Sequence, residues 1–327
     1  MTNVLIFGAG GVGCIYGWFL EKGGAQVTAV CRSNYEAVQA YGVTIRSKKW
    51  GTCVARPTAV RSTSEASQHG PFDYIIVCSK AFPDTAELIR DAVTAETAIV
   101  LAQNGIGIED DYVKAYPENT LISGVVYLPT TQVQPGVVEH GTVLERFEIG
   151  TYPADATSSA KFKVQRLADL FTKGDATCVP YEDVQAKRWE KLAVNAALNP
   201  ITALTLCDDA NFIRSSPGAL DVAKDVMLEV GTLARAYGHD VITKASIDAH
   251  MKRHEERLET GGKEPSMLVD IRHNRPVEVE AILGNTVRLA AAKGVAVPFL
   301  KILYTLTKAR NFAIVQDKSW RPIARIS

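Results

Sequence analysis

The chain has 327 residues, a length that favours two domains over a single core. Apolar residues make up 46% of the sequence and charged residues 22%, which is the composition of a globular protein. Lys plus Arg equals Asp plus Glu, so the formal net charge is zero and no basic excess points to nucleic acid as a partner.

The sequence contains no apolar run of about 18 residues, so we expect no membrane span. The apolar stretch from Val4 to Leu20 lacks a preceding basic segment and is interrupted by glycines, which favours a buried strand and a glycine loop over a signal peptide. The six cysteines are scattered without a C-x-x-C pair. We therefore expect reduced thiols in a cytoplasmic protein, with neither a disulfide framework nor a metal site.

The first half of the chain alternates short apolar runs with helical patterns. We expect strands at residues 4–7, 27–31, 73–78, 98–102 and 121–127, and helices at 12–22 and 85–93. Because the strand runs are continuously apolar, they predict a parallel, doubly wound α/β sheet covered on both faces. Residues 137–139 and 146–149 lie among turn residues and predict an antiparallel finish to this sheet. A helix at 158–173 and a short strand at 176–179 should follow.

From Glu182 onward the strand patterns almost vanish. Helical patterns cover residues 183–206, 217–237, 243–258, 276–293 and 298–311. Gly238 and Gly294 follow two of these patterns, as glycines that end helices do. We therefore predict a Rossmann-like domain over residues 1–181 and an all-helical domain over residues 182–327.

A glycine-rich segment follows the first strand and opens the first helix. It reads Gly8-Ala9-Gly10-Gly11-Val12-Gly13, which is G-x-G-x-x-G in the strand–loop–helix context of a dinucleotide site. Gly8 would allow the tight turn, Gly10 the approach of the pyrophosphate, and Gly13 the close packing of helix on strand. The helix N-terminus would then face the phosphates. A turn that binds no ligand is the weaker interpretation in this context.

The end of the second strand discriminates between the two nicotinamide cofactors. Enzymes that use NAD carry an acid there, whereas this chain has Cys31-Arg32-Ser33. Arg32 could clamp the 2′-phosphate of NADP(H), which we therefore expect as cofactor, although a solvated charge is the simpler alternative. Lys80 and Asn104 follow two further strands and are candidates for the same site, with ordinary loop polarity an equally good interpretation.

The helical pattern after Asp183 carries three polar residues at a spacing of four. Lys191, Asn195 and Asn199 share one face of an otherwise apolar helix that Pro200 interrupts. A solvated stripe is the plain alternative, but Asn is unfavourable inside helices and two beside a lysine favour a function. A cationic Lys191 could protonate a ketone oxygen while a nicotinamide supplies the hydride.

Two further candidates lie in the last third of the chain. Ser266 precedes a short helical stretch, and Glu278 begins the next one. Both have a structural alternative, because serine is a common N-cap residue and acids favour the first turn of a helix.

Taken together, these segments resemble the ketopantoate reductases (2-dehydropantoate 2-reductases), which use NADPH in pantothenate biosynthesis. The resemblance runs from Gly8 to about Pro298 and rests on GAGGVG, CRS, SKAF, QNGIG, PGVVEHG, WEKLAVNAALNPITAL, PSMLVDI and RPVEVEAILGN. It implies a bilobal oxidoreductase with its active site in the interdomain cleft. It also implies roles for single residues: Lys191 as general acid, Glu278 as partner of a substrate hydroxyl, Lys80 beside the cofactor, and Asn104, Asn195, Asn199 and Ser266 around substrate and nicotinamide.

Three positions depart from the family pattern. Asp209, Lys263 and Leu283 stand where the resemblance implies asparagines that contact the substrate. Polar groups of this kind set specificity strongly. The substrate could thus be a branched 2-oxo acid other than ketopantoate, and we expect these three residues to alter substrate choice.

Two alternatives to ketopantoate reduction stay open. The first is a reductase for another 2-oxo or 3-oxo acid of the β-hydroxyacid dehydrogenase type. The second is a regulator that senses NADP(H) without turnover, although such a protein would not need both Lys191 and Glu278. We expect a small-molecule 2-oxo acid as partner, with no nucleic acid and no membrane. The oligomeric state stays open, with a homodimer as the candidate.

Overall fold

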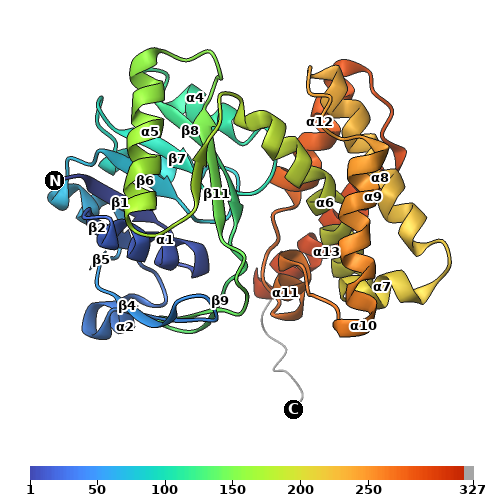
Figure 1. The fold of residues 1–327 in the computed structure, drawn as a ribbon, viewed down its shortest axis with the longest axis horizontal. Coiled ribbons are helices and arrows are strands. Elements are labelled where there is room, and N and C mark those ends of the chain that lie inside the picture. The colour runs from blue at the N-terminus through green and yellow to red at the C-terminus, as the bar shows by residue number, and fades with distance from the viewer. Residues whose placement is uncertain (320–327) are drawn as a thin grey trace. The chain divides into compact units, whose positions relative to one another are not determined.

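The computed structural model describes residues 1–319, with the side chains of residues 1–259 and 261–316. The chain forms two compact units (Figure 1). The first comprises Met1–Asn104 and Ile108–Lys187, and the second comprises Gly105–Gly107 and the chain from Arg188 onward. The α/β class with a helical C-terminal part is confirmed. Residues 320–327 of the predicted helical domain lie outside the described residues.

The first unit is built on an eight-stranded sheet in the order β12-β11-β8-β7-β6-β1-β2-β5. Its strands are β1 (Asn3–Phe7), β2 (Gln26–Val30), β5 (Thr58–Val60), β6 (Tyr74–Val77), β7 (Ala98–Leu101), β8 (Leu121–Tyr127), β11 (Arg146–Thr151) and β12 (Cys178–Pro180). Every neighbouring pair is parallel except β8 and β11. All residues of β6 and β7 are buried, which explains their continuously apolar sequence.

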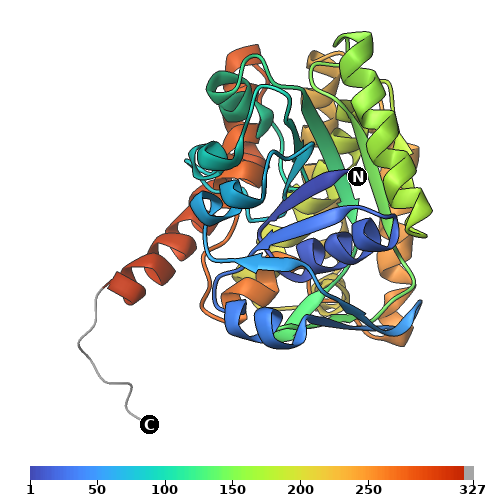
Figure 2. The same cartoon turned by 90° about the vertical axis from the view of Figure 1, so that its left-hand side faces the viewer.

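Helices cover this sheet on both faces. They are α1 (Gly11–Lys22), α2 (Tyr35–Tyr41), α3 (Thr63–Ala66), α4 (Glu109–Ala115) and α5 (Ser158–Lys173), with 3₁₀ turns η1 (Ser67–His69) and η2 (Glu87–Ala92). Helices α1 and α5 contact each other on one face, and α4 lies on the other (Figure 2). The helix predicted at residues 85–93 is thus a shorter 3₁₀ segment, which spans the connection from β6 to β7 in a tighter winding.

A second, four-stranded sheet corrects one prediction. Its order is β4-β3-β10-β9, from β3 (Val43–Ser47), β4 (Gly51–Ala55), β9 (Thr131–Gln134) and β10 (Val137–His140). The antiparallel finish of the large sheet is confirmed for β11, but it is wrong for β10, which pairs with β3 and β9 instead. The partner strand β3 lies far upstream in the sequence, so no local pattern announces this pairing.

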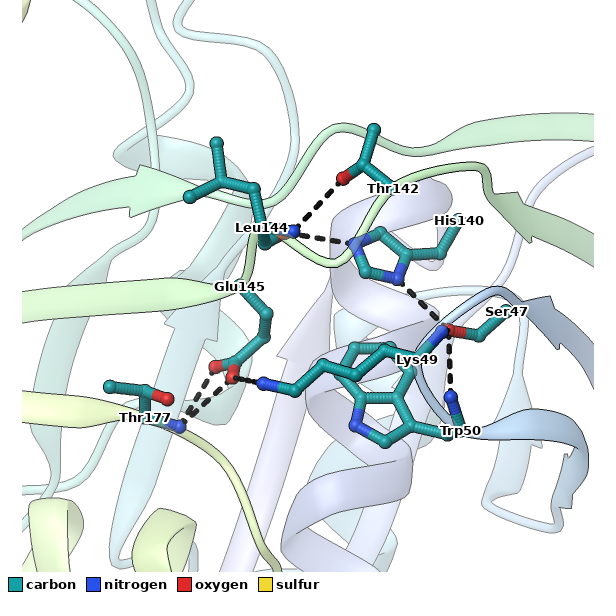
Figure 3. Close-up of polar contacts among 8 residues, drawn as sticks. All are labelled: Ser47, Lys49, Trp50, His140, Thr142, Leu144, Glu145 and Thr177. Carbon is teal, nitrogen blue, oxygen red and sulfur yellow. Dashed lines mark hydrogen bonds and ion pairs between the residues drawn. The ribbon is translucent and has the colours of Figure 1, made fainter.

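Aromatic rings attach the small sheet to α1. Trp50 stacks on His140 with a centroid distance of 4.7 Å and also meets Trp18 and Phe19 of α1. Nε2 of His140 donates to the carbonyl of Leu144 at 2.8 Å, because a carbonyl can only accept (Figure 3). The stacked pair therefore has a fixed ring orientation.

A buried carboxylate completes this junction. Glu145 is almost fully buried, and its oxygens accept from the Lys49 ammonium at 3.0 Å and from the backbone N–H of Thr177 at 2.9 Å (Figure 3). Lys49 lies in the turn between β3 and β4, whereas Thr177 directly precedes β12. One side chain thus connects the small sheet to an edge of the large sheet.

The second unit is helical around its own apolar core. Its elements are α6 (Val184–Thr205), α7 (Asp209–Ser215), α8 (Ala219–Ala236), α9 (Lys244–Glu255), α10 (Arg257–Thr260), α11 (Ser266–Arg272), the π-helical turn η3 (Glu280–Gly284), α12 (Asn285–Lys293) and α13 (Pro298–Ser319). The sequence did not predict α7 or η3, and α13 runs beyond the expected end at residue 311. Among the described helices, none is long and apolar enough to cross a membrane.

The tripeptide Gly105–Gly107 is anchored on the π-helical turn η3. The N–H of Ile106 donates to the carbonyl of Ala281 at 3.1 Å, and Asn285 Nδ2 donates to the Ile106 carbonyl at 2.7 Å. Gly105 has φ +103°, and a Cβ there would overlap the Ala281 carbonyl. The QNGIG segment therefore requires glycine at this position for backbone packing alone.

Candidate active site

The glycine loop between β1 and α1 shows a steric reason for two of its glycines, Gly8 and Gly13. Gly8 has φ +103°, and a Cβ there would lie 2.6 Å from the backbone nitrogen of Ser79. A Cβ on Gly13 would overlap the carbonyl oxygen of Gly8, so this glycine allows α1 to pack closely on β1. A Cβ on Gly10 would meet nothing within 4 Å. The loop therefore leaves open space beside Gly10, where the sequence predicted the approach of a pyrophosphate.

Two further residues of the motif, Gly11 and Val12, pack within the first unit. A Cβ on Gly11 would overlap the hydroxyl of Thr130, which follows β8. Val12 is half-buried and packs against the core of the unit. Both residues thus shape the loop through packing on its own unit.

Asn34 supports the same loop and was missed by the sequence analysis. It occupies the N-cap position of α2, yet its side chain makes no capping bond there. Instead Nδ2 donates to the carbonyl of Ala9 at 2.7 Å, and the residue is 4% exposed. The only hint in the sequence was an Asn shortly after the second strand, which is equally typical of an ordinary helix start.

The strand ends next to the loop gather further polar residues. Strands β1, β6 and β7 are adjacent and parallel, so Ser79, Lys80 and Asn104 follow strands that end at one edge of the sheet. The Gln103 side chain donates to the Ser79 carbonyl at 3.0 Å and so links the two strand ends. The Ser79 hydroxyl is buried and has no hydrogen-bond partner in the part of the chain that the structure describes. Sequence reasoning singled out Lys80 and Asn104 but not this hydroxyl.

Two arginines follow the neighbouring strands β2 and β5. Arg32 is exposed, and its side chain forms no hydrogen bond or ion pair with residues 1–319 that the structure describes. Arg61, which the sequence analysis missed, pairs with Glu36 and lies over the ring of Tyr35 at 3.9 Å. Arg61 is thus engaged within its own unit, whereas the Arg32 guanidinium is available to a ligand.

The polar stripe predicted on one helix lies within α6. Lys191, Asn195 and Asn199 occupy its second and later turns at a spacing of four residues. Lys191 and Asn195 are half-buried, and Asn199 is 4% exposed. The residues between them belong largely to the core of the second unit, including Leu192, Ala193, Ala196, Ala197 and Leu198. Because Asn199 is buried, a merely solvated stripe does not describe this face.

The structure also tests the capping alternatives for Ser266 and Glu278. Pro265 holds the N-cap position of α11, so Ser266 is the first helical residue, is exposed, and is not the N-cap. Glu278 lies just before the helical turn that leads into η3, and its carbonyl accepts from Ile282 N–H at 3.1 Å. Its side chain is 9% exposed. The π-helical turn η3 begins two residues after Glu278, and such turns are frequent at functional sites.

The three departures from the family pattern differ in their surroundings. Lys263 is exposed, but Leu283 is fully buried in the core of the second unit. Asp209 is 1% exposed, and both of its carboxylate oxygens accept hydrogen bonds from this unit. Contrary to the expectation from the sequence, Asp209 and Leu283 therefore offer no surface to a substrate.

The predicted site residues divide between the two units. The glycine loop, Arg32, Lys80 and Asn104 belong to the first, while Lys191, Asn195, Asn199, Ser266 and Glu278 belong to the second. No group of three or more His, Cys, Asp or Glu residues in the described part of the chain could hold a metal ion.

Comparison with known proteins matches both parts of the chain. Residues 4–154 match the family model described as ketopantoate reductase PanE/ApbA, and residues 183–311 match its C-terminal model. The 2-dehydropantoate 2-reductase of Pyrobaculum aerophilum is 30% identical, over 94% of this chain and 97% of that protein.

Solved structures show the same similarity. A crystal structure of 2-dehydropantoate 2-reductase from Methylococcus capsulatus is 33% identical, covers 95% of this chain and 97% of that one, and has a TM-score of 0.82. A ternary structure of D-mandelate dehydrogenase with NADH and anilino(oxo)acetate has a TM-score of 0.81 over 96% of this chain and 99% of that one. At 19% identity, the second likeness concerns the fold.

Proposed function

The chain belongs to the ketopantoate reductase family, and from this premise we propose that it reduces a 2-oxo acid, foremost 2-dehydropantoate, to the 2-hydroxy acid with NADPH. The observation that carries the proposal is the face of α6, where Lys191, Asn195 and Asn199 interrupt an apolar helix. A structural helix would gain nothing from a half-buried lysine and a buried asparagine on this face.

The residues of the first unit fit a dinucleotide. The open space at Gly10 suits a pyrophosphate against the N-terminus of α1. The buried Ser79 hydroxyl, which no described residue satisfies, lies at the same sheet edge and is a polar group for such a ligand. Arg32 would hold the 2′-phosphate, and Lys80 would contribute a second positive charge. Bound NADPH would supply the hydride.

Lys191 would act as the general acid. Its ammonium would donate a proton to the ketone oxygen and stabilise the negative charge that develops on that oxygen. Asn104, Asn195, Asn199 and Ser266 would orient the substrate through hydrogen bonds. Glu278 would accept a hydrogen bond from a hydroxyl of the substrate. In this assignment, Lys191 would protonate the ketone oxygen, and the other side chains would bind or orient the substrate.

A second candidate function is the reduction of another branched 2-oxo acid. It is favoured by the exposed Lys263, which stands where the family resemblance implies an asparagine. A non-catalytic NADP(H) sensor would need no general acid, so the presence of Lys191 disfavours this alternative. Cytoplasmic location, a place in pantothenate biosynthesis and a homodimer remain predictions.

Substitution of Lys191 tests the mechanism. Lys191→Ala should lower kcat by about 10²–10⁴, the usual contribution of a proton donor or oxyanion partner, with little change in NADPH affinity. Lys187→Ala is the matched control, since Lys187 lies one turn earlier on α6 with its ammonium over the Tyr181 ring. Equal losses in both variants, or a Lys191→Ala enzyme with normal kcat, would remove Lys191 from this role.

A further inference from the structure

Asp209 is a buried anion at the start of α7. Its side chain is 1% exposed, and burial of a charge is costly unless donors surround it. Burial by itself would raise the pKa of this carboxyl, but hydrogen bonds from His254, from the Lys263 N–H and from Arg257 outweigh it and lower the pKa to about 2. The carboxylate is therefore charged at neutral pH and can only accept hydrogen bonds.

Three of its four donors come from outside α7. Oδ2 accepts from His254 Nδ1 at the end of α9 at 2.7 Å and from Arg257 Nη1 of α10 at 2.5 Å. Oδ1 accepts from the N–H of Lys263 at 2.6 Å and from that of Ala210 at 2.9 Å. One side chain thus joins α7 to both ends of the segment that runs from α9 to the loop before α11.

The loop Gly261–Pro265 is held at its centre by this residue. Besides the bond to the carboxylate, Lys263 accepts the N–H of Asp209 at its own carbonyl at 3.1 Å, so the two residues exchange a pair of hydrogen bonds. Gly262 packs directly against Asp208, the residue before Asp209. A Cβ at Gly262 would overlap the Asp208 carboxylate. The loop therefore follows the surface of α7 closely.

This loop leads straight into α11. Pro265 is its N-cap residue and Ser266 its first residue, while Met267 and Ile271 bury the helix in the core of the second unit. The exposed Ser266 is thus fixed on one side by the core and on the other by Asp209. Loss of a contact that binds substrate and transition state equally raises KM and leaves kcat unchanged.

We propose that Asp209 is a positioning residue that sets the place of Ser266 through the Gly261–Pro265 loop without touching the substrate. The proposal rests on the proposed function, which assigns Ser266 to the substrate. It replaces the expectation that Asp209 contacts the substrate directly. Substrate specificity would then depend on the shape of this loop and on the exposed Lys263 that it carries.

The test is the isosteric variant Asp209→Asn. An amide has one acceptor oxygen where the carboxylate has two, so the variant loses either the bonds from His254 and Arg257 or those from the Lys263 and Ala210 N–H groups, and the loop loosens. We expect faster amide hydrogen exchange at residues 257–265. We also expect a tenfold to hundredfold rise in KM for the oxo acid, with kcat and the KM for NADPH within about twofold.

Two neighbouring acids provide controls. Asp208→Asn keeps a side chain that can cap the N-terminus of α7. Glu264→Gln removes the Glu264 carboxylate, which lies in the same loop and pairs with the exposed Arg272. Both should retain wild-type exchange and KM. His254→Asn should retain exchange near the wild type, since asparagine can place an amide donor near Nδ1, whereas His254→Leu should resemble Asp209→Asn.

The outcomes are distinguishable. Unchanged exchange at residues 257–265 in Asp209→Asn overturns the proposal, and so does an equal rise of KM for NADPH and oxo acid. Faster exchange across the whole second unit also overturns it, because Asp209 would then be a general stability residue. If the wild type turns over no 2-oxo acid, the proposed function fails, while the exchange experiment still decides whether Asp209 holds the loop.

Discussion

Arg32 is the single residue on which the cofactor assignment depends most. It is exposed at the end of β2, where enzymes that use NAD carry an acid, and it forms no ion pair within the described part of the chain. Arg32→Ala should raise the KM for NADPH by about 10–100-fold, because a charge-assisted bond is worth roughly 1.5–3 kcal/mol. The KM for NADH should change little.

Steady-state kinetics with both cofactors measure this effect. Arg46→Ala serves as the control, since Arg46 is an exposed arginine of β3 that pairs with Glu139 across the small sheet. A wild type that prefers NADH, or an Arg32→Ala enzyme that loses both cofactors equally, would contradict the assignment to NADPH.

Asp209 also predicts how the stability of the protein changes at acid pH. Its pKa lies near 2, below the ordinary value of 3.8, through bonds that outweigh the effect of burial. Its contribution to stability is therefore present above pH 3.8 and is lost as the pH falls toward 2; by linkage it amounts to about 2–3 kcal/mol. Urea midpoints of wild type and Asp209→Asn should differ at pH 6 and converge as the pH falls toward 2. Parallel curves over this range would refute the claim.

The sequence predicted the roles of those residues whose structural partners lie close to them along the chain. The roles of Gly8 and Gly13 follow from a strand–loop–helix motif within one short segment. Asn34 was missed because its bond to Ala9 reaches back over the whole of α1 and β2. Asp209 was misassigned because its donors His254 and Lys263 lie more than forty residues away, where no spacing rule applies.

Among the elements, the junction of the two sheets gives the clearest stability prediction. Glu145 is nearly fully buried and bonds to Lys49 and to the Thr177 N–H. Glu145→Ala leaves both donors without this partner, so we expect the first unit to lose about 3 kcal/mol of stability. Thermal unfolding followed by tryptophan fluorescence measures this loss, since Trp18 and Trp50 lie in the same junction.

Glu139→Ala is the matched comparison, because the Arg46–Glu139 pair is exposed and spans 3.7 Å. An exposed pair of this kind contributes about 0–1 kcal/mol. Equal stability losses in the two variants would show that the Glu145 contacts do not hold the sheets together.

Element prediction succeeded where hydrophobic periodicity is strong. Strands β1, β6 and β7 and helices α1, α5 and α6 were expected within a few residues of their observed bounds. The small sheet was not expected, since β3 and β10 meet only through a pairing between distant segments. The turn η3 was missed because a π-helical widening leaves the sequence pattern of an ordinary helix unchanged.

At the scale of the whole molecule, the proposed reaction would need groups from both units. The first carries the glycine loop and Arg32, and the second carries Lys191 and Glu278. The fold class and the family were predictable from the sequence, because both rest on motifs spread over the chain. The substrate was not predictable, since it depends on side chains whose surroundings come from long-range packing, as Asp209 shows.

The central claim is that this chain reduces a 2-oxo acid with NADPH. The most direct measurement is the rate of NADPH oxidation with purified protein over a panel of 2-oxo acids that includes 2-dehydropantoate and aromatic and unbranched compounds. We predict turnover with at least one branched 2-oxo acid, 2-dehydropantoate foremost, and a kcat reduced about 10²–10⁴-fold in Lys191→Ala. NADPH binding without oxidation by any acid of the panel would contradict it.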